Sequence, residues 1–265
     1  MFRSLSYFLN RYIFQKEYMV AKSTKHGVKL RFKTEDAIGR CIYKTATYED
    51  ILTNYLTHHI PFEENDVFVD VGANIGWYSL VMSKTIPRSC KIFSFEPDLL
   101  NSETLRENRD LNGCSNLQIV SKALGAEAGQ ATLFLYPGKN RGRHSLIPLG
   151  GNKEERLVEV ITLDDYFKEQ GVDVTKIKLL KIDIEGFEYP ALLGAKMALQ
   201  NIPNVLMEYS PEYMEKGGFE PLKLIELMEE LNFNAHRILE TGLERLSPEI
   251  LRRQRSQTDL LWIKN

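Results

Sequence analysis

The sequence is poor in cysteine and has no long apolar run. Its 265 residues contain three cysteines, which are scattered and form no CxxC pair: Cys41, Cys90 and Cys114. Isolated cysteines in odd number argue against a disulfide framework or a structural zinc site. They are typical of a reducing compartment, so we expect a cytoplasmic protein. No stretch approaches the roughly 18 apolar residues that a membrane-spanning helix requires.

The chain also lacks a strong excess of charge of either sign. It has 34 lysines and arginines against 36 aspartates and glutamates, which gives a formal net charge of −2. This balance supplies no global positive field that would hold a polyanion, so nucleic acid is disfavoured as a partner. The apolar share of 43% and the charged share of 26% are typical of an ordinary globular protein.

The N-terminal segment carries the pattern of an amphipathic helix. Its apolar residues recur at three- and four-residue steps, namely Phe2, Leu5, Leu9 and Ile13, with Phe8 and Tyr12 beside them. One interpretation is a lid that packs on the domain. A second is an interfacial helix that rests on anionic lipid near a glycolipid substrate, which would make the protein membrane-peripheral. A third is packing against a partner chain in a homodimer.

From Phe62 onward, short apolar strands alternate with segments of helical spacing. This alternation predicts an α/β fold, with a mainly parallel sheet of seven strands and helices on both faces. The expected strands are residues 67–71, 92–95, 117–120, 177–182, 205–208, 235–239 and 260–263, and the expected helices are residues 78–84, 99–111, 189–199 and 222–231. We expect one domain over residues 48–265, preceded by an N-terminal extension over residues 1–47.

The segment from Ala131 to Val160 breaks this alternation. Two β-rich pieces, residues 132–136 and 157–161, flank a long loop that contains Gly, Arg and Pro. We expect an antiparallel insertion, and the loop over residues 137–151 is a candidate substrate lid because long loops in compact domains often carry function.

The strongest local signal is the segment VFVDVGANIGWYSL, an apolar strand that runs into Gly72 and Gly76 and then into a helix. Small residues there let the backbone approach a ligand, and a helix N-terminus presents unpaired N–H groups. The next strand ends in FSFEP, which places Glu96 at the carboxyl edge of the sheet. A carboxylate at that position can accept hydrogen bonds from a ribose diol, so the segment predicts an adenosine site.

The loop chemistry separates a nicotinamide dinucleotide from S-adenosylmethionine. A dinucleotide site requires G-x-G-x-x-G so that the backbone can contact a pyrophosphate, whereas this loop has Asn74 at its third position and no third glycine. The carboxylate of Asp70 would repel a pyrophosphate, but it suits the ammonium and sulfonium charges of S-adenosylmethionine. Alternatively, Asp70 caps N–H groups in the turn. S-adenosylmethionine is therefore the predicted cofactor.

Further motifs follow in order: SKALG, ITLDDYF, LLKIDIEGFE, LLGA and VLMEYSPE come after DVGANIG and FEP. In this order they resemble the FkbM-type methyltransferases, over roughly residues 48–265. The resemblance implies a class I methyltransferase fold of the Rossmann-like type. It also implies a methyl acceptor that is a hydroxyl of a sugar, a glycolipid or a polyketide-like small molecule. Residues 1–47 match no motif of the family.

The same resemblance implies which residues bind S-adenosylmethionine. They come from the glycine loop, the end of the second strand and two later motifs: Asp70, Gly72, Ala73, Asn74, Gly76, Glu96, Pro97 and Asp183, with Ala123 and Leu124 near the adenine. Tyr48 and Glu49 resemble a short Tyr-Glu element that would close over the methionine end. The alternative for this pair is an ordinary helix start.

Methyl transfer to a hydroxyl requires alignment of the acceptor and removal of its proton. Asp183 ends the fourth strand at the edge where this fold builds its sites, and Glu185 follows it. Crowded carboxylates can act as a base, coordinate a divalent ion or cap the next helix. We expect Asp183 or Glu185 to contact acceptor or cofactor. We expect no metal, because no histidine or second acidic motif lies near in sequence.

His144 is a second candidate base, because an unperturbed histidine has a pKa near 6.5. The alternative is a solvent-exposed loop histidine. Arg141 and Arg143 beside it could bind a phosphate or carboxylate of the acceptor, or remain solvated. Glu208 ends the fifth strand at the same edge, where it could complete the site or bond to a neighbouring loop.

The leading hypothesis is therefore O-methylation of a small-molecule or glycan acceptor. N-methylation needs less help from a base and is an alternative. A nicotinamide-dependent oxidoreductase is disfavoured by the glycine loop. A non-catalytic binding module is disfavoured because such a pocket would not require Asp70, Gly72, Gly76 and Glu96 together.

Overall fold

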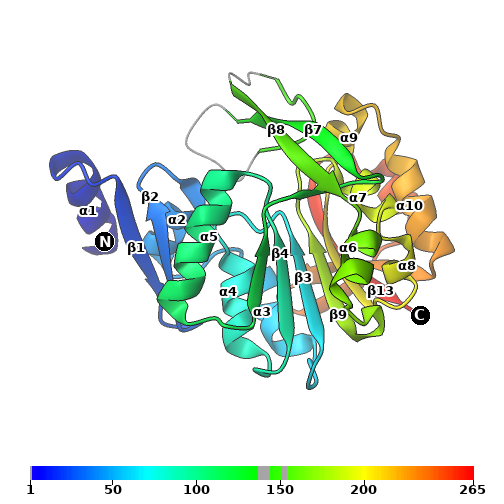
Figure 1. Ribbon diagram of the computed structural model, residues 1–265, viewed down its shortest axis with the longest axis horizontal. Coiled ribbons are helices and arrows are strands. Elements are labelled where there is room, and N and C mark those ends of the chain that lie inside the picture. Colours follow the sequence, from blue (N-terminus) through cyan, green and yellow to red (C-terminus); the bar gives the residue numbers. More distant parts are fainter. Residues whose placement is uncertain (1, 137–143, 151–153) are drawn as a thin grey trace.

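The protein is described by a computed structural model that covers residues 2–136, 144–150 and 154–265. Residues 137–143, with Arg141 and Arg143, and residues 151–153 lie outside the described residues, so most of the predicted lid loop does too. The described part contains an eight-stranded sheet with helices on both faces, a three-stranded sheet and an N-terminal hairpin (Figure 1). The predicted α/β fold, with a mainly parallel sheet and helices on both faces, is confirmed.

The central sheet has the strand order β12-β11-β13-β10-β9-β3-β4-β5. Its strands are β3 (Val67–Val71), β4 (Lys91–Phe95), β5 (Leu117–Val120), β9 (Ile177–Ile182), β10 (Asn204–Tyr209), β11 (Phe233–Leu239), β12 (Gly242–Arg245) and β13 (Thr258–Lys264). The strands from β5 to β10 pair in parallel, and β13 is antiparallel to β10. All seven predicted strands are present. The eighth, β12, was not predicted because every residue in it is exposed and no apolar alternation marks it.

The helices that follow residue 48 are α3 (Asp50–His59), α4 (Trp77–Thr85), α5 (Leu99–Asn112), α6 (Leu163–Gln170), α7 (Glu188–Leu193), α8 (Lys196–Leu199), α9 (Pro211–Lys216), α10 (Pro221–Glu230) and α11 (Pro248–Arg253), with a short 3-10 turn at Val174–Lys176. The predicted helix over residues 189–199 is divided into α7 and α8. The division falls at Gly194, where the backbone packs so closely that a Cβ would lie 2.0 Å from the carbonyl oxygen of Gly125.

The two faces of the sheet bury two separate apolar clusters. Along β3, Val67, Val69 and Val71 belong to the cluster on one face, whereas Phe68 belongs to the cluster on the other. Because successive side chains of a strand point to opposite faces, Asp70 lies on the same side as Phe68, toward α4. This register decides what Asp70 can contact.

The predicted antiparallel insertion is confirmed. It consists of β6 (Ala123–Leu124), β7 (Gly129–Leu135) and β8 (Glu154–Ile161), and β7 pairs with β8 in antiparallel register. The Oγ of Ser145, in the described part of the predicted loop, donates a hydrogen bond of 2.9 Å to the carbonyl oxygen of Glu185. The insertion is thereby attached to the chain that leaves β9, over the carboxyl end of the sheet.

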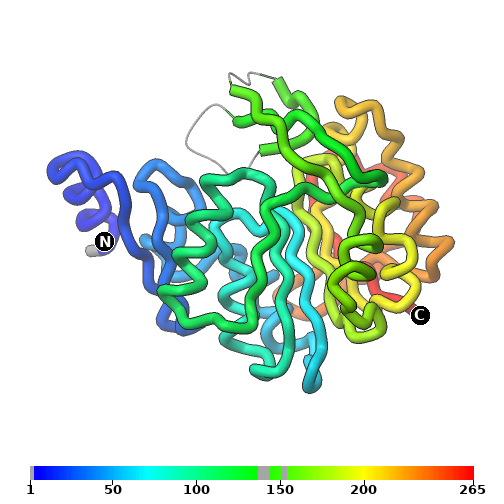
Figure 2. Tube along the Cα trace, in the orientation of Figure 1, coloured from blue at the N-terminus to red at the C-terminus, as the bar shows by residue number. Residues whose placement is uncertain are grey.

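The N-terminal extension is more than a helix. It contains α1 (Phe2–Phe8), a π-helical turn η1 (Leu9–Ile13), the hairpin strands β1 (Tyr18–Ser23) and β2 (Val28–Lys33), and α2 (Ala37–Thr45), and it stands at one side of the molecule (Figure 2). Leu30 and Phe32 of the hairpin belong to the same buried cluster as Phe68. The boundary at residue 47 therefore divides a continuous core, and the domain assignment stays a prediction.

The outer edge of β2 is covered by side chains of α5. Asn108 and Asn112 each exchange hydrogen bonds with the backbone of β2, at Arg31 and Lys29. These amides satisfy backbone groups that an edge strand leaves unpaired.

In the described part of the chain, no helix is long and apolar enough to cross a bilayer.

Candidate active site

Two cavities meet at the carboxyl ends of β3, β4 and β9. The first lies between the end of β4 and the insertion, and we call it the apolar cavity; its empty space is about 530 Å³, part of it open to solvent. The second lies toward α3 and is lined by several acids, so we call it the carboxylate cavity; its empty space is about 920 Å³, part of it open to solvent. Gly72, Asn74 and Asp183 line both. A ligand that fills both cavities would therefore pass Asp183.

The glycines of the loop after β3 are required by the packing of the protein itself. Gly72 has φ +75°, and a Cβ there would lie 1.9 Å from the backbone oxygen of Asp183. Gly76 has φ +98° and packs against Leu105, and a Cβ at Gly76 would lie 2.1 Å from the Leu105 side chain. Both positions thus need glycine before any ligand is considered.

The N–H groups of this loop are already used within the protein. Those of Gly72 and Ala73 donate to the carbonyl oxygen of Phe95, at 2.9 and 3.1 Å. The N–H of Asn74 donates to the Glu96 carboxylate at 2.8 Å. A dinucleotide pyrophosphate needs such groups free, so the loop geometry disfavours a nicotinamide cofactor.

Glu96 lies where the sequence predicts it, at the end of β4 and in the wall of the apolar cavity. One carboxylate oxygen accepts from the N–H of Asn74 and the other from the N–H of Asp98, at 2.8 and 2.9 Å. Burial raises the pKa of Glu96 to about 7, although these backbone donors oppose the rise. These two N–H groups and the side chain of Asn101 hold the carboxylate in one orientation, and it retains acceptor capacity toward the cavity for a hydroxyl donor.

The rest of the apolar cavity fits an adenosine group. Pro97, Ala123 and Leu124 line it, and the ring of Phe187 adds a flat apolar wall. The contact of Pro97, Ala123 and Leu124 with the cofactor stays a prediction. The Oδ1 atom of Asn74 is buried and has no hydrogen-bond partner in the described part of the chain. A buried acceptor without a partner is costly, so it favours a ligand that donates to it.

Asp70 lies beneath the cavities and is not among the residues that line them. Its carboxylate accepts a hydrogen bond of 2.5 Å from Ser79 and lies 3.5 Å from the Nζ of Lys181. The predicted contact of Asp70 with the cofactor stays a prediction. Asp70 instead contacts Ser79 on α4 and Lys181 on β9.

Lys181 is the residue at this site that sequence analysis missed. Its Nζ lies 3.5 Å from carboxylate oxygens of both Asp70 and Asp183, and 5.0 Å from the ring centre of Tyr78. Burial alone would lower the pKa of Lys181, but the charges of Asp183, Asp70 and Glu49 raise it above its ordinary value. Its signal was present in the sequence, as a charge inside the apolar run LLKI over residues 179–182.

The predicted Tyr-Glu element lines the carboxylate cavity. Tyr48 and Glu49 stand at the start of α3, and Glu49 accepts a hydrogen bond of 2.5 Å from the hydroxyl of Tyr78. Three non-glycine residues of this cavity have positive φ angles: Glu49 (45°), Asn74 (51°) and Glu185 (55°). Such strain persists where the surrounding structure imposes it, and it clusters at functional sites.

The acids that follow β9 divide into two roles. Asp183 and Glu185 line the carboxylate cavity, whereas Glu188 points into the turn and accepts N–H bonds of 3.1 Å from Ile184 and Gly186. Burial raises the pKa of Glu188 to about 8. Glu188 therefore stabilises the turn before α7, and Asp183 and Glu185 are placed at the predicted edge.

Glu208 faces the same cavity from β10. Its carboxylate accepts hydrogen bonds from Ser210, at 3.1 Å, and from Gln257 on the segment before β13. Burial, followed by the negative charges of Asp183 and Glu185, raises its pKa to about 10. Glu208 thus both bonds to neighbouring segments and lines the site. Gln257 was missed because nothing in its local sequence marks it.

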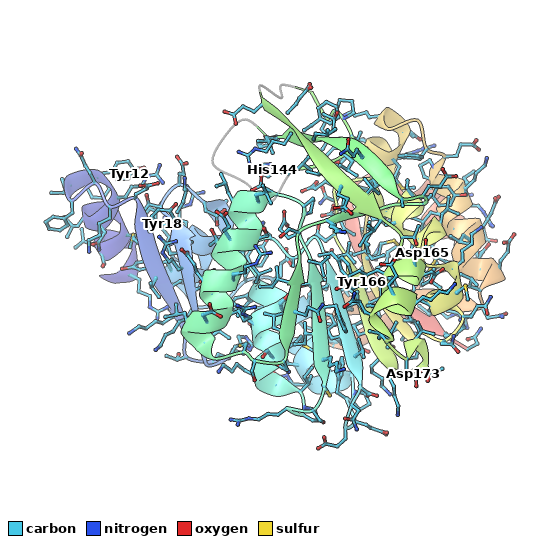
Figure 3. All side chains as sticks on the ribbon, in the orientation of Figure 1. Tyr12, Tyr18, His144, Asp165, Tyr166 and Asp173 are labelled. Atoms are coloured by element: carbon cyan, nitrogen blue, oxygen red, sulfur yellow. The ribbon has the colours of Figure 1, made fainter. Side chains whose placement is uncertain are left out.

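His144 lies on the other side of the site. It lines the apolar cavity with Glu96, beside the insertion (Figure 3), and its Nδ1 accepts the N–H of Tyr136 at 3.1 Å. It is not among the residues that line the carboxylate cavity. Its role as a base stays a prediction.

Among the described residues, no group of three or more acids, histidines or cysteines could hold a metal ion.

Comparisons with known proteins agree with this geometry. The model of the methyltransferase FkbM domain matches residues 70–235. Methyltransferase sdnD from Sordaria araneosa is 29% identical over 219 residues, which cover 72% of this chain and 82% of that protein. The 31-O-demethyl-FK506 methyltransferase FkbM from Streptomyces tacrolimicus is 29% identical over 181 residues, with 57% and 68% covered.

A third relative is the hexuronic acid methyltransferase AglP of Haloferax volcanii, 28% identical over 168 residues, which cover 63% of each chain. The family model spans more than half of the chain and includes the glycine loop, Glu96 and the acids after β9. The chain therefore belongs to the FkbM family of S-adenosylmethionine-dependent methyltransferases.

Proposed function

We propose that this protein methylates a hydroxyl oxygen of a neutral, sugar-like acceptor that binds in the carboxylate cavity. The observation that carries the proposal is the junction of the two cavities. The apolar cavity has the features of an adenosine site, the carboxylate cavity is polar, and Asp183 lines both. A donor whose adenosine fills the first cavity and whose methionine end passes Asp183 would meet, in the second cavity, an acceptor beside a carboxylate.

S-adenosylmethionine, when bound, supplies a methyl group already activated by its sulfonium charge. Glu96 would accept hydrogen bonds from the ribose hydroxyls, and Asn74 would accept one through its buried Oδ1. The acids of the carboxylate cavity create a negative field that favours the ammonium and sulfonium charges. The protein thus binds and orients, and it excludes bulk water by the apolar wall of Leu124 and Phe187.

Asp183 is the base in this proposal. Its side chain is about one-third exposed (36%), so an acceptor can reach it, and Lys181 holds it in place at 3.5 Å. Burial and the charges of Asp183 and Glu185 raise the pKa of Glu208, which favours its protonated form. A protonated Glu208 can donate a hydrogen bond to an acceptor oxygen without competing for the same proton.

The charge of the cavity selects among acceptors. Carboxylates accept hydrogen bonds from hydroxyls, as sugar-binding sites require, and they repel anions. We therefore expect neutral glycosides to be better substrates than uronic acids or sugar phosphates. N-methylation is the alternative, because the same negative lining attracts a protonated amine.

Turnover with a panel of acceptors tests the proposal. The protein is incubated with S-adenosyl-[methyl-¹³C]methionine and with neutral glycosides, uronic acids and amino sugars, and products are identified by mass spectrometry and NMR. Asp183→Asn should lower kcat by about 100-fold or more, as expected for loss of a general base. His144→Ala should leave kcat within a few-fold. A label on nitrogen, or the reverse order of the two variants, would refute the proposal.

A further inference from the structure

The helical segment over residues 2–13, formed by α1 and η1, presents its apolar side chains to solvent. The exposed fractions are large, and we call these residues the apolar strip: Leu5 (58%), Phe8 (50%), Leu9 (38%), Tyr12 (54%) and Ile13 (60%), with Phe14 (64%) directly after the helix. A helix that covers a domain buries its apolar side. This helix does the reverse, and Figure 3 shows Tyr12 at the outer edge of the extension.

The helix is held in this orientation by polar contacts on its inner side. Tyr7 is only 4% exposed, and its hydroxyl donates to the carbonyl oxygen of Thr34. The guanidinium of Arg11 donates to the same carbonyl and, at 3.1 Å, to the Tyr7 oxygen. The Ser6 hydroxyl lies 2.9 Å from that of Tyr43 on α2. The outward apolar strip is therefore a fixed surface.

The extension also has a charge opposite to that of the rest of the chain. Residues 1–47 contain ten lysines and arginines but three acids, for a net charge of +7, whereas residues 48–265 contain 24 basic and 33 acidic residues, for a net charge of −9. Arg3, just before the apolar strip in the sequence, is exposed, and so are Lys16 and Lys22 after it. An exposed apolar surface within a basic region is complementary to a bilayer, which has an apolar interior and can carry anionic headgroups.

We propose that the apolar strip docks this methyltransferase on an anionic phospholipid bilayer. Phe8, Ile13 and Phe14 enter the boundary between headgroups and acyl chains, and the basic side chains of the extension lie at the phosphates. A second copy of the chain fits less well, because packing strip against strip would bring two segments of charge +7 together.

Docking in this way leaves the active site accessible. No residue of the segment 2–14 is among those that line the apolar or the carboxylate cavity. The alternative of a lid packed by its apolar side on the domain is not supported, because that side is exposed. The strip instead holds the enzyme at a surface where a membrane-bound acceptor would be concentrated.

Cosedimentation of the full chain with vesicles tests the proposal. Vesicles of phosphatidylcholine are compared with vesicles that also contain phosphatidylglycerol. The triple variant Phe8→Ser/Ile13→Ser/Phe14→Ser should weaken binding at least about tenfold, since three large apolar side chains no longer enter the bilayer. Arg3→Gln and Lys16→Gln should each weaken it about fivefold. The matched control Leu157→Ser/Met197→Ser removes equally exposed apolar residues elsewhere (67% and 69%) and should bind like the wild type.

The affinity for S-adenosylmethionine, measured by calorimetry, should be unchanged in the triple variant, which confirms that it folds. The proposal would be overturned if the wild type bound equally well to vesicles with and without phosphatidylglycerol. It would also be overturned if the triple variant bound the anionic vesicles as well as the wild type does. So would sedimentation velocity that finds a wild-type dimer which the triple variant dissociates, because the apolar strip would then belong to an interface between two copies.

Discussion

Glu96 should make the affinity for S-adenosylmethionine depend on pH near neutrality. In the free protein, burial raises the pKa of Glu96 to about 7, so the carboxyl is half protonated there. The ribose hydroxyls donate hydrogen bonds and therefore prefer the charged carboxylate. Binding of the cofactor must then compete with a proton at this oxygen.

The magnitude follows from that pKa. With a pKa of about 7, roughly one-tenth of Glu96 is charged at pH 6 and roughly nine-tenths at pH 8. If the cofactor binds only the charged form, its Kd falls about tenfold from pH 6 to pH 8, which corresponds to about 1.4 kcal/mol. Glu96→Gln should weaken binding at all pH values and abolish this dependence.

The same pKa predicts the opposite trend for stability without cofactor. The folded protein keeps a proton on Glu96 up to about pH 7, whereas the unfolded chain loses it near pH 4.5. The folded state thus binds more protons between these values, so the contribution of Glu96 to the free energy of unfolding falls as pH rises from about 5 to 7 and is flat above. The fall amounts to about 3 kcal/mol.

Isothermal titration at pH 6, 7 and 8 measures the affinity, and urea unfolding without cofactor measures the stability. The control is Glu188→Gln, which removes another buried carboxyl of raised pKa, about 8, that lines neither cavity. This variant should keep the pH dependence of affinity. A wild-type Kd that is flat with pH, or a Glu96→Gln variant that retains the dependence, would refute the reasoning.

Two further predictions concern the loop and the buried lysine. Gly72→Ala should destabilise the protein in urea by at least about 2 kcal/mol more than the control Gly113→Ala, because both have positive φ but only Gly72 faces a backbone oxygen at 1.9 Å. If the two variants lost equal amounts of stability, the chain at the end of β9 would be able to move away from the added Cβ. Lys181→Met leaves the buried carboxylate of Asp70 without its cation, so it should destabilise the protein in urea by about 3 kcal/mol or more. A stability equal to that of the wild type would show that Asp70 does not need this cation in the folded protein.

The sequence was sufficient for the parallel core of the fold. Strands such as Val67–Val71 are buried on both faces, so they read as continuous apolar runs with turn residues after them. The hairpin of the extension was missed, although the alternation of Leu30 and Phe32 with basic residues is a strand pattern. The exposed strand Gly242–Arg245 had no pattern to find.

The site was predictable where a motif fixes the backbone and unpredictable where distant segments meet. Asn74 and Glu96 are joined by a hydrogen bond that follows from the order of strand, loop and strand. The side chain of Asp70 points toward α4 and not into the cavities, and this direction depends on the register of β3, which the motif alone does not predict. Gln257 reaches Glu208 only because β13 pairs with β10 in antiparallel register, a contact between residues 49 positions apart.

The most direct test of the account is a crystal structure of the protein with S-adenosylhomocysteine. The account predicts that the ribose hydroxyls bond to Glu96, that the adenine lies between Leu124 and Phe187, and that the homocysteine end passes Asp183 into the carboxylate cavity. A nucleoside bound elsewhere, or a homocysteine end directed away from Asp183, would contradict both the assignment of the two cavities and the role proposed for Asp183.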